Sequence, residues 1–269
     1  MDAPNARHDS LMATTLGARA ERLTAVRSLH AVKGRRLAGR FAFEGATLLE
    51  EARSSGYPIE EIYATEAAYE AAGAVRELER EGVPVFLVGE RAAAKISDLD
   101  SPAGLVAVAP ARLADPQRLF SDDGTVLILA DLNDPGNAGT LLRCAAAFGC
   151  PGVVFGRLGV DPYHPKVVRA AMGAIFRVPI AVADPPTVAR AAAAAGVDIA
   201  GLAIGGDDLR AAVWPARNAI AVGNERHGLG SWSQACKRFF AIPMPGRAES
   251  LNAAIAGSIA LYEAVRARA

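Results

Sequence analysis

Short apolar runs alternate with longer amphipathic segments through the C-terminal half of the chain. The apolar runs, which we predict to be strands, cover residues 126–130, 153–155, 180–182, 199–204, 219–222 and 239–242. Helical spacing of apolar residues marks the segments 137–148, 188–195 and 251–266. Strands without polar alternation are typical of parallel sheets that are buried on both faces. The pattern therefore predicts an α/β fold in which helices cover a parallel sheet.

The N-terminal half repeats this pattern on a smaller scale. Helix-like segments cover residues 18–37, 46–54 and 67–81. Strand-like runs cover residues 41–45, 59–64, 83–88 and 104–109. We expect a flexible tail over residues 1–18 and a small α/β domain over residues 19–110. Residues 111–123 hold Pro116, three aspartates and no strand pattern, so they are predicted to link this domain to a second one over residues 124–269.

Composition narrows the class of protein. With 51% hydrophobic and 22% charged residues, the chain is neither disordered nor short of apolar material for two cores. No apolar stretch reaches the roughly 18 residues of a membrane span, and the first residues lack the pattern of a secretory signal. Cys144, Cys150 and Cys236 form no CxxC pair and the four histidines are scattered. These features predict a cytoplasmic protein with reduced thiols, no membrane segment and no metal site.

Charge is balanced over the whole chain but not locally. The 29 basic residues match the 29 acidic ones, so net charge indicates no partner. Between residues 19 and 40, however, seven lysines and arginines stand against one glutamate. This run is either a solvated helix face or a surface that binds the phosphates of a polyanion.

Three segments of the C-terminal half carry candidate chemistry, and the first follows the strand at 126–130. Asn137, Thr140 and Arg143 recur at intervals of three and so form a polar stripe on one face of the predicted helix. Asn137 is expected to cap this helix. An amide, exposed N–H groups and a guanidinium together suit an oxyanion or a phosphate. A capped helix with a surface arginine is the alternative.

The other two segments follow the predicted strands at 219–222 and 239–242. Gly223 lets a ligand approach the backbone, and Glu225 places a carboxylate at the sheet edge, where desolvation is costly without a partner or a task. A tight charged turn is the alternative. In the third segment two prolines exclude a regular strand. Ser250 and Asn252 are then expected to start the last helix, since hydroxyl and amide side chains cap helices.

Common nucleotide and hydrolase motifs are absent from the sequence. It contains no GxGxxG turn after the first strand of the second half, no GxxxxGK[ST] and no GxSxG. Rossmann cofactor binding, P-loop hydrolysis and α/β-hydrolase chemistry are therefore excluded.

The three segments, in this order, resemble the SpoU (TrmH-like) family of RNA ribose 2′-O-methyltransferases in the SPOUT superfamily. The matching text is NAGTLLR at 137–143, VGNERHGL at 222–229 and IPMPGRAESLNAAIA at 242–256. A further likeness covers the loop at 161–173. Residues 20–110 are similar, less strongly, to the ribosomal-protein-like substrate-binding domain that often precedes this catalytic domain.

The resemblance implies a SPOUT-type parallel sheet with a deep trefoil knot, although knots are rare in proteins. S-adenosylmethionine would lie in the knot. The residues implied to bind it are Gly223, Asn224, Ile242, Met244 and Leu251. Two subunits would pack as a homodimer through the knot and the last helix, with Arg143 of one subunit facing the cofactor of the other.

The resemblance also implies a catalytic set. These residues are Asn137, Arg143, Glu225, Ser250 and Asn252. An arginine keeps its proton at neutral pH, so we interpret Arg143 as a clamp for an RNA phosphate and a stabiliser of the developing alkoxide, with Asn137 orienting it. The alternative, in which Arg143 is the base, stays open.

RNA binding is expected at two basic segments. The candidate residues are Arg35, Arg36, Arg40, Lys166 and Arg169. The implied activity is S-adenosylmethionine-dependent 2′-O-methylation of a ribose in structured RNA, with 23S ribosomal RNA preferred as substrate. A tRNA methyltransferase, an antibiotic-resistance rRNA methyltransferase and a non-catalytic RNA-binding factor are the alternatives.

Overall fold

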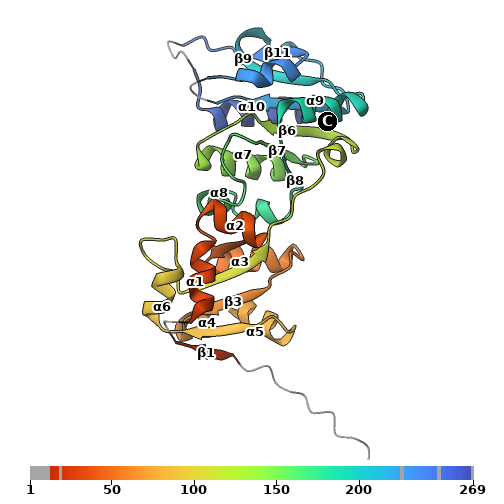
Figure 1. Ribbon diagram of the computed structural model, residues 1–269. Coiled ribbons are helices and arrows are strands. Elements are labelled where there is room, and N and C mark those ends of the chain that lie inside the picture. Colours follow the sequence, from red (N-terminus) through yellow and green to blue (C-terminus); the bar gives the residue numbers. More distant parts are fainter. Residues whose placement is uncertain (1–12, 18–19, 225–226, 247–249, 268–269) are drawn as a thin grey trace, which may run out of the picture. The chain divides into compact units, whose positions relative to one another are not determined.

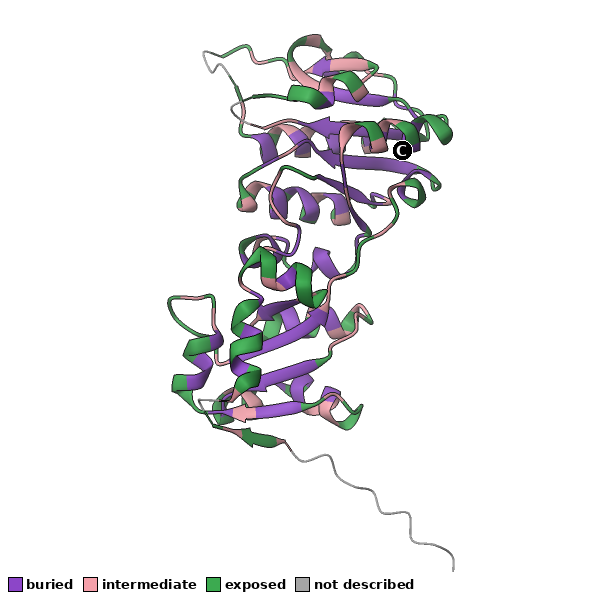
Figure 2. Cartoon of the chain, in the orientation of Figure 1, coloured by how far each residue is buried: buried purple, intermediate pink, exposed green. Residues whose placement is uncertain are grey.

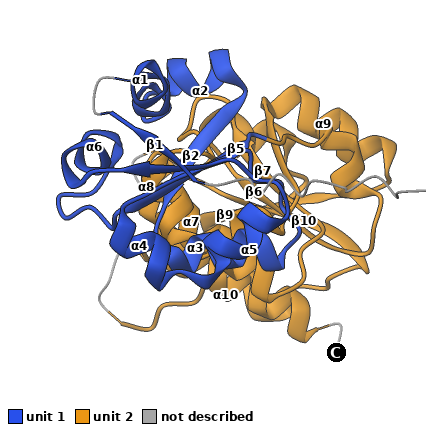
Figure 3. Ribbon diagram, turned by 90° about the horizontal axis from the view of Figure 1, so that it is seen from below, with its two compact units in different colours: residues 1–111 blue, residues 112–269 orange. Residues whose placement is uncertain are grey.

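The computed structural model describes residues 13–17, 20–224, 227–246 and 250–267. The chain forms two compact units, Met1–Ala111 and Arg112–Ala269, which Figure 3 shows in blue and orange. Within the described residues, no helix is long and apolar enough to cross a membrane.

Unit 1 is built on a five-stranded sheet in the order β1-β4-β3-β5-β2. Its strands are β1 (Thr14–Leu16), β2 (Arg40–Glu44), β3 (Glu61–Ala64), β4 (Val85–Val88) and β5 (Leu105–Pro110). Strands β1, β4 and β3 run parallel, and β5 is antiparallel to both β3 and β2. Of the segment expected to be a flexible tail, residues 1–12 and 18 lie outside the described residues. Within it, Thr14–Leu16 instead forms β1, which pairs with Phe86, Leu87 and Val88 at the sheet edge.

Helices cover both faces of this sheet. They are α1 (Glu21–Ser28), α2 (Val32–Ala38), α3 (Ala46–Ser54), α4 (Glu66–Ala71), α5 (Gly73–Arg80) and α6 (Glu90–Ile96). In Figure 3, α1 and α6 lie on one side of the sheet and α3, α4 and α5 on the other. Leu23 and Val26 of α1 and Ile96 of α6 share a buried cluster with Tyr63 and Phe86 of the sheet.

Two predicted helices are each divided in two, and α6 was not predicted. The helix expected over residues 18–37 ends at Ser28, and the guanidinium of Arg35 donates to the backbone oxygens of Leu29 and His30 at that end, 2.9 Å from each. The helix expected over 67–81 is interrupted by the extended backbone of Ala72. The three consecutive alanines of α6 give little contrast between its faces, so the hydrophobic pattern there is weak.

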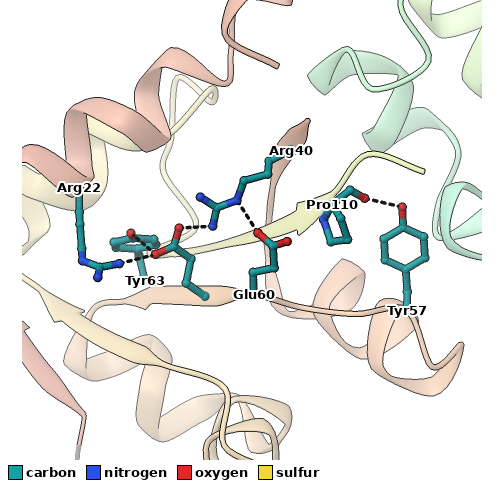
Figure 4. Close-up of polar contacts among 7 residues, drawn as sticks. Arg22, Arg40, Tyr57, Glu60, Tyr63 and Pro110 are labelled. Carbon is teal, nitrogen blue, oxygen red and sulfur yellow. Dashed lines mark hydrogen bonds and ion pairs between the residues drawn. The ribbon is translucent and has the colours of Figure 1, made fainter. Parts of the chain in front are cut away.

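A network of charged side chains joins α1, β2 and β3 in unit 1 (Figure 4). The carboxylate of Glu61 is buried and accepts hydrogen bonds from Arg22, Arg40 and the hydroxyl of Tyr63. Arg40 also pairs with Glu60. A buried carboxylate needs such partners, because unpaired it would be costly to remove from water.

Tyr63→Phe should destabilise unit 1 by about 1.5 kcal/mol at pH 7, the contribution of a hydrogen bond to a charged group. Burial, and then the hydrogen bond and charge of Glu61, raise the pKa of Tyr63 above its ordinary value of 10.0. The folded state therefore holds this proton where the unfolded chain loses it, so stability falls as the pH rises from about 10. Urea unfolding between pH 8 and about 11 should show this loss in the wild type and a smaller one in Tyr63→Phe. An equal loss of unfolding free energy with rising pH in both proteins would contradict the prediction.

Unit 2 contains a six-stranded sheet in the order β11-β9-β10-β6-β7-β8, and every neighbouring pair is parallel (Figure 1). The strands are β6 (Gly124–Leu129), β7 (Val153–Gly156), β8 (Ile180–Ala183), β9 (Ile199–Asp208), β10 (Arg217–Val222) and β11 (Arg238–Ala241). The predicted α/β class, with a parallel sheet in the C-terminal half, is confirmed.

Helices pack on both faces of this second sheet. The α-helices are α7 (Pro135–Ala147), α8 (Pro165–Ala170), α9 (Pro185–Ala194) and α10 (Ala253–Arg266), and the 3-10 helices are η1 (Pro116–Phe120), η2 (Ala174–Phe176), η3 (Leu209–Ala211) and η4 (Gly230–Ala235). On one face, α9, η1 and η4 enclose a core that includes Ala221 of β10. On the other face, Gly257 of α10 approaches Leu141 of α7 and Val222 of β10. Figure 2 shows the central strands β6, β7 and β10 largely buried, whereas β9 and β11 at one edge are partly exposed.

The segment expected to be a linker, residues 111–123, instead packs into unit 2 from Arg112 onward. Leu119 and Phe120 of η1 are 2% and 1% exposed and belong to its core. The backbone N–H of Ala114 donates to the oxygen of Ile180. The hydroxyl of Tyr163 both accepts from and donates to the backbone of Arg112. The aspartates and Pro116 indicated a linker, but the apolar pair beside them decides where the segment packs.

Candidate active site

A cavity of about 910 Å³ lies among the loops that follow β10 and β11, beside the middle of β9. In open parallel sheets, ligands bind beyond the carboxyl ends of the strands. All five residues expected to bind the cofactor line this cavity: Gly223, Asn224, Ile242, Met244 and Leu251. Ser250 and Asn252 line it too. Residues that are far apart in the sequence are therefore gathered around one space.

Gly223 allows the two sides of the loop after β10 to come together. A Cβ atom on Gly223 would lie 2.3 Å from the carbonyl carbon of Gly228 and 2.6 Å from the backbone nitrogen of Leu229. Asn224 and Gly228 exchange two backbone hydrogen bonds of 2.8 Å. The loop is thus a tight hairpin of backbone at the cavity wall, and only glycine fits at position 223.

The cavity wall is mainly apolar. Val222, Leu229, Phe239, Phe240 and Ala256 contribute to it, beside the polar groups of Asn224, Ser250 and Asn252. Ligand pockets generally combine apolar walls with a few polar groups that fix orientation. The cavity therefore suits a ligand with an apolar part and a polar part.

The helix α7 begins differently from our expectation. Asp134, not Asn137, caps it, because the Asp134 carboxylate accepts from the backbone N–H of Asn137 at 2.7 Å. Pro135 fits the first position of the helix, where its missing N–H costs nothing. Asn137 consequently lies inside the first turn, and its side chain is available to other elements.

Asn252 joins the starts of α7 and α10. Its side-chain oxygen accepts from the backbone N–H groups of Ala254 and Ile255, so it caps α10 as its position in the sequence predicts. Its side-chain nitrogen donates to the side-chain oxygen of Asn137, at 3.0 Å. Asn137 is thereby tied to a residue that lines the cavity.

The other expected catalytic residues differ in position. Arg143 is exposed on α7, six residues beyond Asn137, and is not among the described residues that line the cavity. Ser250 is exposed at the cavity. Glu225 lies outside the described residues. Among the residues that the structure describes, no group of three or more histidine, cysteine, aspartate or glutamate side chains could hold a metal ion.

The structure divides the candidate RNA-binding residues into two sets. Arg35 is only 3% exposed and bonds to the end of α1, so it is not the surface contact that we expected. Arg40 is paired with Glu60 and Glu61 (Figure 4). By contrast, Arg36 on α2 and Lys166 on α8 are exposed, and Arg169 at the end of α8 is half-buried.

Sequence reasoning missed one part of the cavity, namely the middle of β9. Leu202, Ala203, Ile204 and Gly205 line it. The register between β9 and β11 shifts at this point: Phe239 pairs with Gly201, whereas Phe240 pairs with Asp207. The adjacent Gly205 and Gly206 were the available signal, since glycine inside a strand often marks a bulge.

Comparison with known families identifies both units. Residues 124–262, more than half of the chain, match the model of the SpoU rRNA Methylase family. The chain belongs to this family. Residues 20–107 match the MRM3-like substrate binding domain. The family resemblance predicted from the three segments is confirmed. This member of the SpoU family is a methyltransferase.

Relatives resemble the SpoU-family chain over nearly its full length. RlmP of Bacillus subtilis, a 23S rRNA (guanosine(2553)-2′-O)-methyltransferase, is 29% identical over 88% of this chain and 92% of its own. An AdoMet-bound rRNA methyltransferase from Sinorhizobium meliloti is 29% identical, with a TM-score of 0.84 over 94% of this chain and 98% of that one. The SpoU methyltransferase AviRb from Streptomyces viridochromogenes, in complex with the cofactor AdoMet, is also 29% identical, with a TM-score of 0.82 over 93% and 98%.

Proposed function

We propose that this protein transfers a methyl group from S-adenosylmethionine to the 2′-hydroxyl of a ribose in structured ribosomal RNA, with 23S rRNA as the substrate. The observation that carries the proposal is the cavity, around which seven residues expected from the family motifs come together. The match of unit 1 to a substrate binding domain and the names of full-length relatives support an rRNA substrate. This substrate also favours a cytoplasmic location.

The cavity fits the cofactor in size and lining. Its volume of about 910 Å³ is within the range of roughly 300–1,000 Å³ that small-molecule sites occupy. Leu229, Ile242 and Leu251 provide apolar surface for an adenine ring, and the glycine at position 223 brings backbone groups within reach of polar atoms. When bound, S-adenosylmethionine supplies a methyl group carried on a positively charged sulfur.

The residues of α7 act on the RNA rather than on the cofactor. Arg143 is exposed, and its planar guanidinium suits a phosphate oxygen pair. From there it stabilises negative charge that develops on the ribose oxygen. Asn137, held by Asn252 at 3.0 Å, orients Arg143 for this role. The family motif assigns Glu225 to this pocket as well.

A trefoil knot and a homodimer complete the proposed site. The knot is supported by the path of the chain, which passes from β11 at the sheet edge to α10 against the central strands β10 and β6.

The dimer is supported by exposed apolar residues on α10, where Ile255 is 53% and Tyr262 is 52% exposed. In this dimer, Arg143 of one subunit faces the cavity of the other. Tyr262→Asp should then yield monomers in light scattering, and an unchanged mass would contradict this interface.

Two assays test the function directly. Calorimetry should show that the protein binds S-adenosylmethionine, and incubation with labelled cofactor should transfer label to ribosomal RNA. Binding without transfer to any RNA would instead support a non-catalytic factor. Transfer to tRNA alone would contradict the proposed substrate while leaving the enzyme class intact.

Charge reversal on α2 should separate RNA binding from folding. Arg36→Glu is expected to weaken RNA binding, with no change in cofactor affinity. The slope of log affinity against log salt concentration should fall in magnitude by about one, the loss of one phosphate contact.

Arg35→Glu should unfold unit 1 instead, because a buried carboxylate would face the oxygens of Leu29 and His30. Filter binding at several salt concentrations and thermal unfolding give the two readouts.

The matched control for Arg36→Glu is Arg190→Glu, an equal charge change at an exposed position on α9. RNA affinity that falls equally in both variants would indicate a general effect of charge and remove Arg36 from the RNA surface.

A further inference from the structure

One residue, Asp131, bonds to three separate segments, one of which lines the cavity. It lies two residues after β6, and no motif considered in the sequence includes it. Its carboxylate accepts from the backbone N–H of Leu158 at 3.1 Å and from the indole N–H of Trp232 at 2.9 Å. Its backbone oxygen accepts from the side chain of Asn224 at 3.3 Å. The donors belong to the loop after β7, to η4 and to the loop after β10.

The backbone at Asp131 is held in an unfavourable conformation. Its φ is 50°, in the left-handed region, which residues other than glycine rarely adopt. Strained backbone of this kind persists only where surrounding contacts fix it, and it is concentrated at functional sites. The three hydrogen bonds to Asp131 are contacts of this sort.

Neighbouring glycines make room for this residue. A Cβ atom on Gly156 would lie 2.3 Å from a carboxylate oxygen of Asp131 and 2.5 Å from its backbone nitrogen. One on Gly159 would lie 3.0 Å from the Asp131 Cα. The loop after β7 therefore packs directly against Asp131, and a side chain at either glycine would displace it.

Asp131 is connected to both sides of the proposed site. Asn224 lines the cavity and pairs with Gly228 across the hairpin. Trp232 is 1% exposed and fixed in the core, so its indole is a rigid anchor. Three residues further along the chain, Asp134 caps α7, which carries Asn137 and Arg143.

We propose that Asp131 is a positioning residue for cofactor binding, a role that rests on the proposed function. It fixes the positions of the Asn224 hairpin, which is the loop closed by the Asn224–Gly228 backbone bonds, and of the start of α7 relative to the indole of Trp232. Its carboxylate, bonded to Leu158 and Trp232, fixes the position of the backbone oxygen that accepts from Asn224. Loss of the carboxylate should therefore shift that oxygen and weaken the binding of S-adenosylmethionine without altering the RNA surface of unit 1.

Two substitutions separate this role from general stability. In Asp131→Asn, the single side-chain oxygen can accept from only one of the two N–H donors, and the amide N–H groups then face the other. Asp131→Gly removes both acceptors but adopts the left-handed conformation without strain. The matched control is Asp198→Asn, the same change at an exposed position that precedes β9.

Cofactor affinity is measured by calorimetry, RNA affinity by filter binding, and stability by urea unfolding. We expect affinity for S-adenosylmethionine to fall about 10- to 100-fold, the range known for residues that orient the ligands of metal ions, and more in Asp131→Gly than in Asp131→Asn. The KM for the cofactor should rise with little change in kcat. The RNA affinity of both Asp131 variants should stay at the wild-type value. The control Asp198→Asn should bind the cofactor and RNA as the wild type does.

Trp232 provides an independent readout. In a Trp214→Phe background, in which Trp232 is the one remaining tryptophan of the two in the chain, its emission should shift in both Asp131 variants. Unchanged cofactor affinity, even with shifted emission, would overturn the proposal. Cofactor and RNA affinities that fall together with the urea midpoint would also overturn it, since that is the result of a purely structural role. Wild-type protein that fails to bind the cofactor would contradict the proposed function and, with it, this inference.

Discussion

Arg143→Lys is expected to lower methyl transfer about 100-fold, the cost of removing one group that stabilises transition-state charge. Lysine keeps the positive charge but loses the planar fork that binds two phosphate oxygens together. Arg143 is exposed on α7, away from the described residues that line the cavity. Because the proposed partner of Arg143 is an RNA phosphate, cofactor affinity should stay unchanged, and the defect should appear in the single-turnover rate of transfer.

Arg118→Lys is the control for this variant, because it makes the same exchange on η1 at an exposed position of the same unit. Methyl transfer by Arg143→Lys at the rate of Arg118→Lys would remove the clamp role. A parallel loss of cofactor affinity would mean that Arg143 helps to bind the cofactor, and it would contradict a role limited to the RNA phosphate.

Gly223→Ala is expected to reduce methyl transfer about 100-fold, because displacement by about 1 Å is enough to cost that much. The added Cβ would overlap backbone atoms of Gly228 and Leu229, and backbone cannot rotate away as a side chain can. The Asn224 hairpin must open, so the variant should also bind S-adenosylmethionine more weakly in calorimetry.

Gly89→Ala is the matched control, since a Cβ there has no described atom within 4 Å. It should bind the cofactor as the wild type does. Wild-type cofactor affinity in Gly223→Ala would show that the hairpin tolerates opening, and it would contradict the proposed cavity wall.

The sequence predicts unit 2 well where local signals agree with the fold. Uninterrupted apolar runs define its strands, and Asn252 caps α10 because few other residues can satisfy the first N–H groups. Asn137 was wrongly predicted as a cap because Asp134, three residues earlier, has the same capacity and is followed by proline. Which of two suitable residues caps a helix depends on packing, and packing cannot be read from the sequence.

Unit 1 is less predictable because long-range contacts override local patterns. Arg35 is charged and therefore predicted to be exposed, but it is buried against backbone oxygens that only the turn after α1 presents. The strand β1 has no apolar alternation, and pairing with β4 is what makes it a strand. The role of Asp131 likewise could not be predicted, because its contacts form only when the loops after β7 and β10 meet around it in the folded chain.

The most direct test of the central claim uses the purified protein, unmodified 23S rRNA and isotopically labelled S-adenosylmethionine. After transfer, the RNA is digested to nucleosides and the position of the label is determined by mass spectrometry. We predict label on the ribose 2′-oxygen of a single nucleotide, and none with Arg143→Ala. Label on a base, or equal labelling by Arg143→Ala, would contradict the function proposed here.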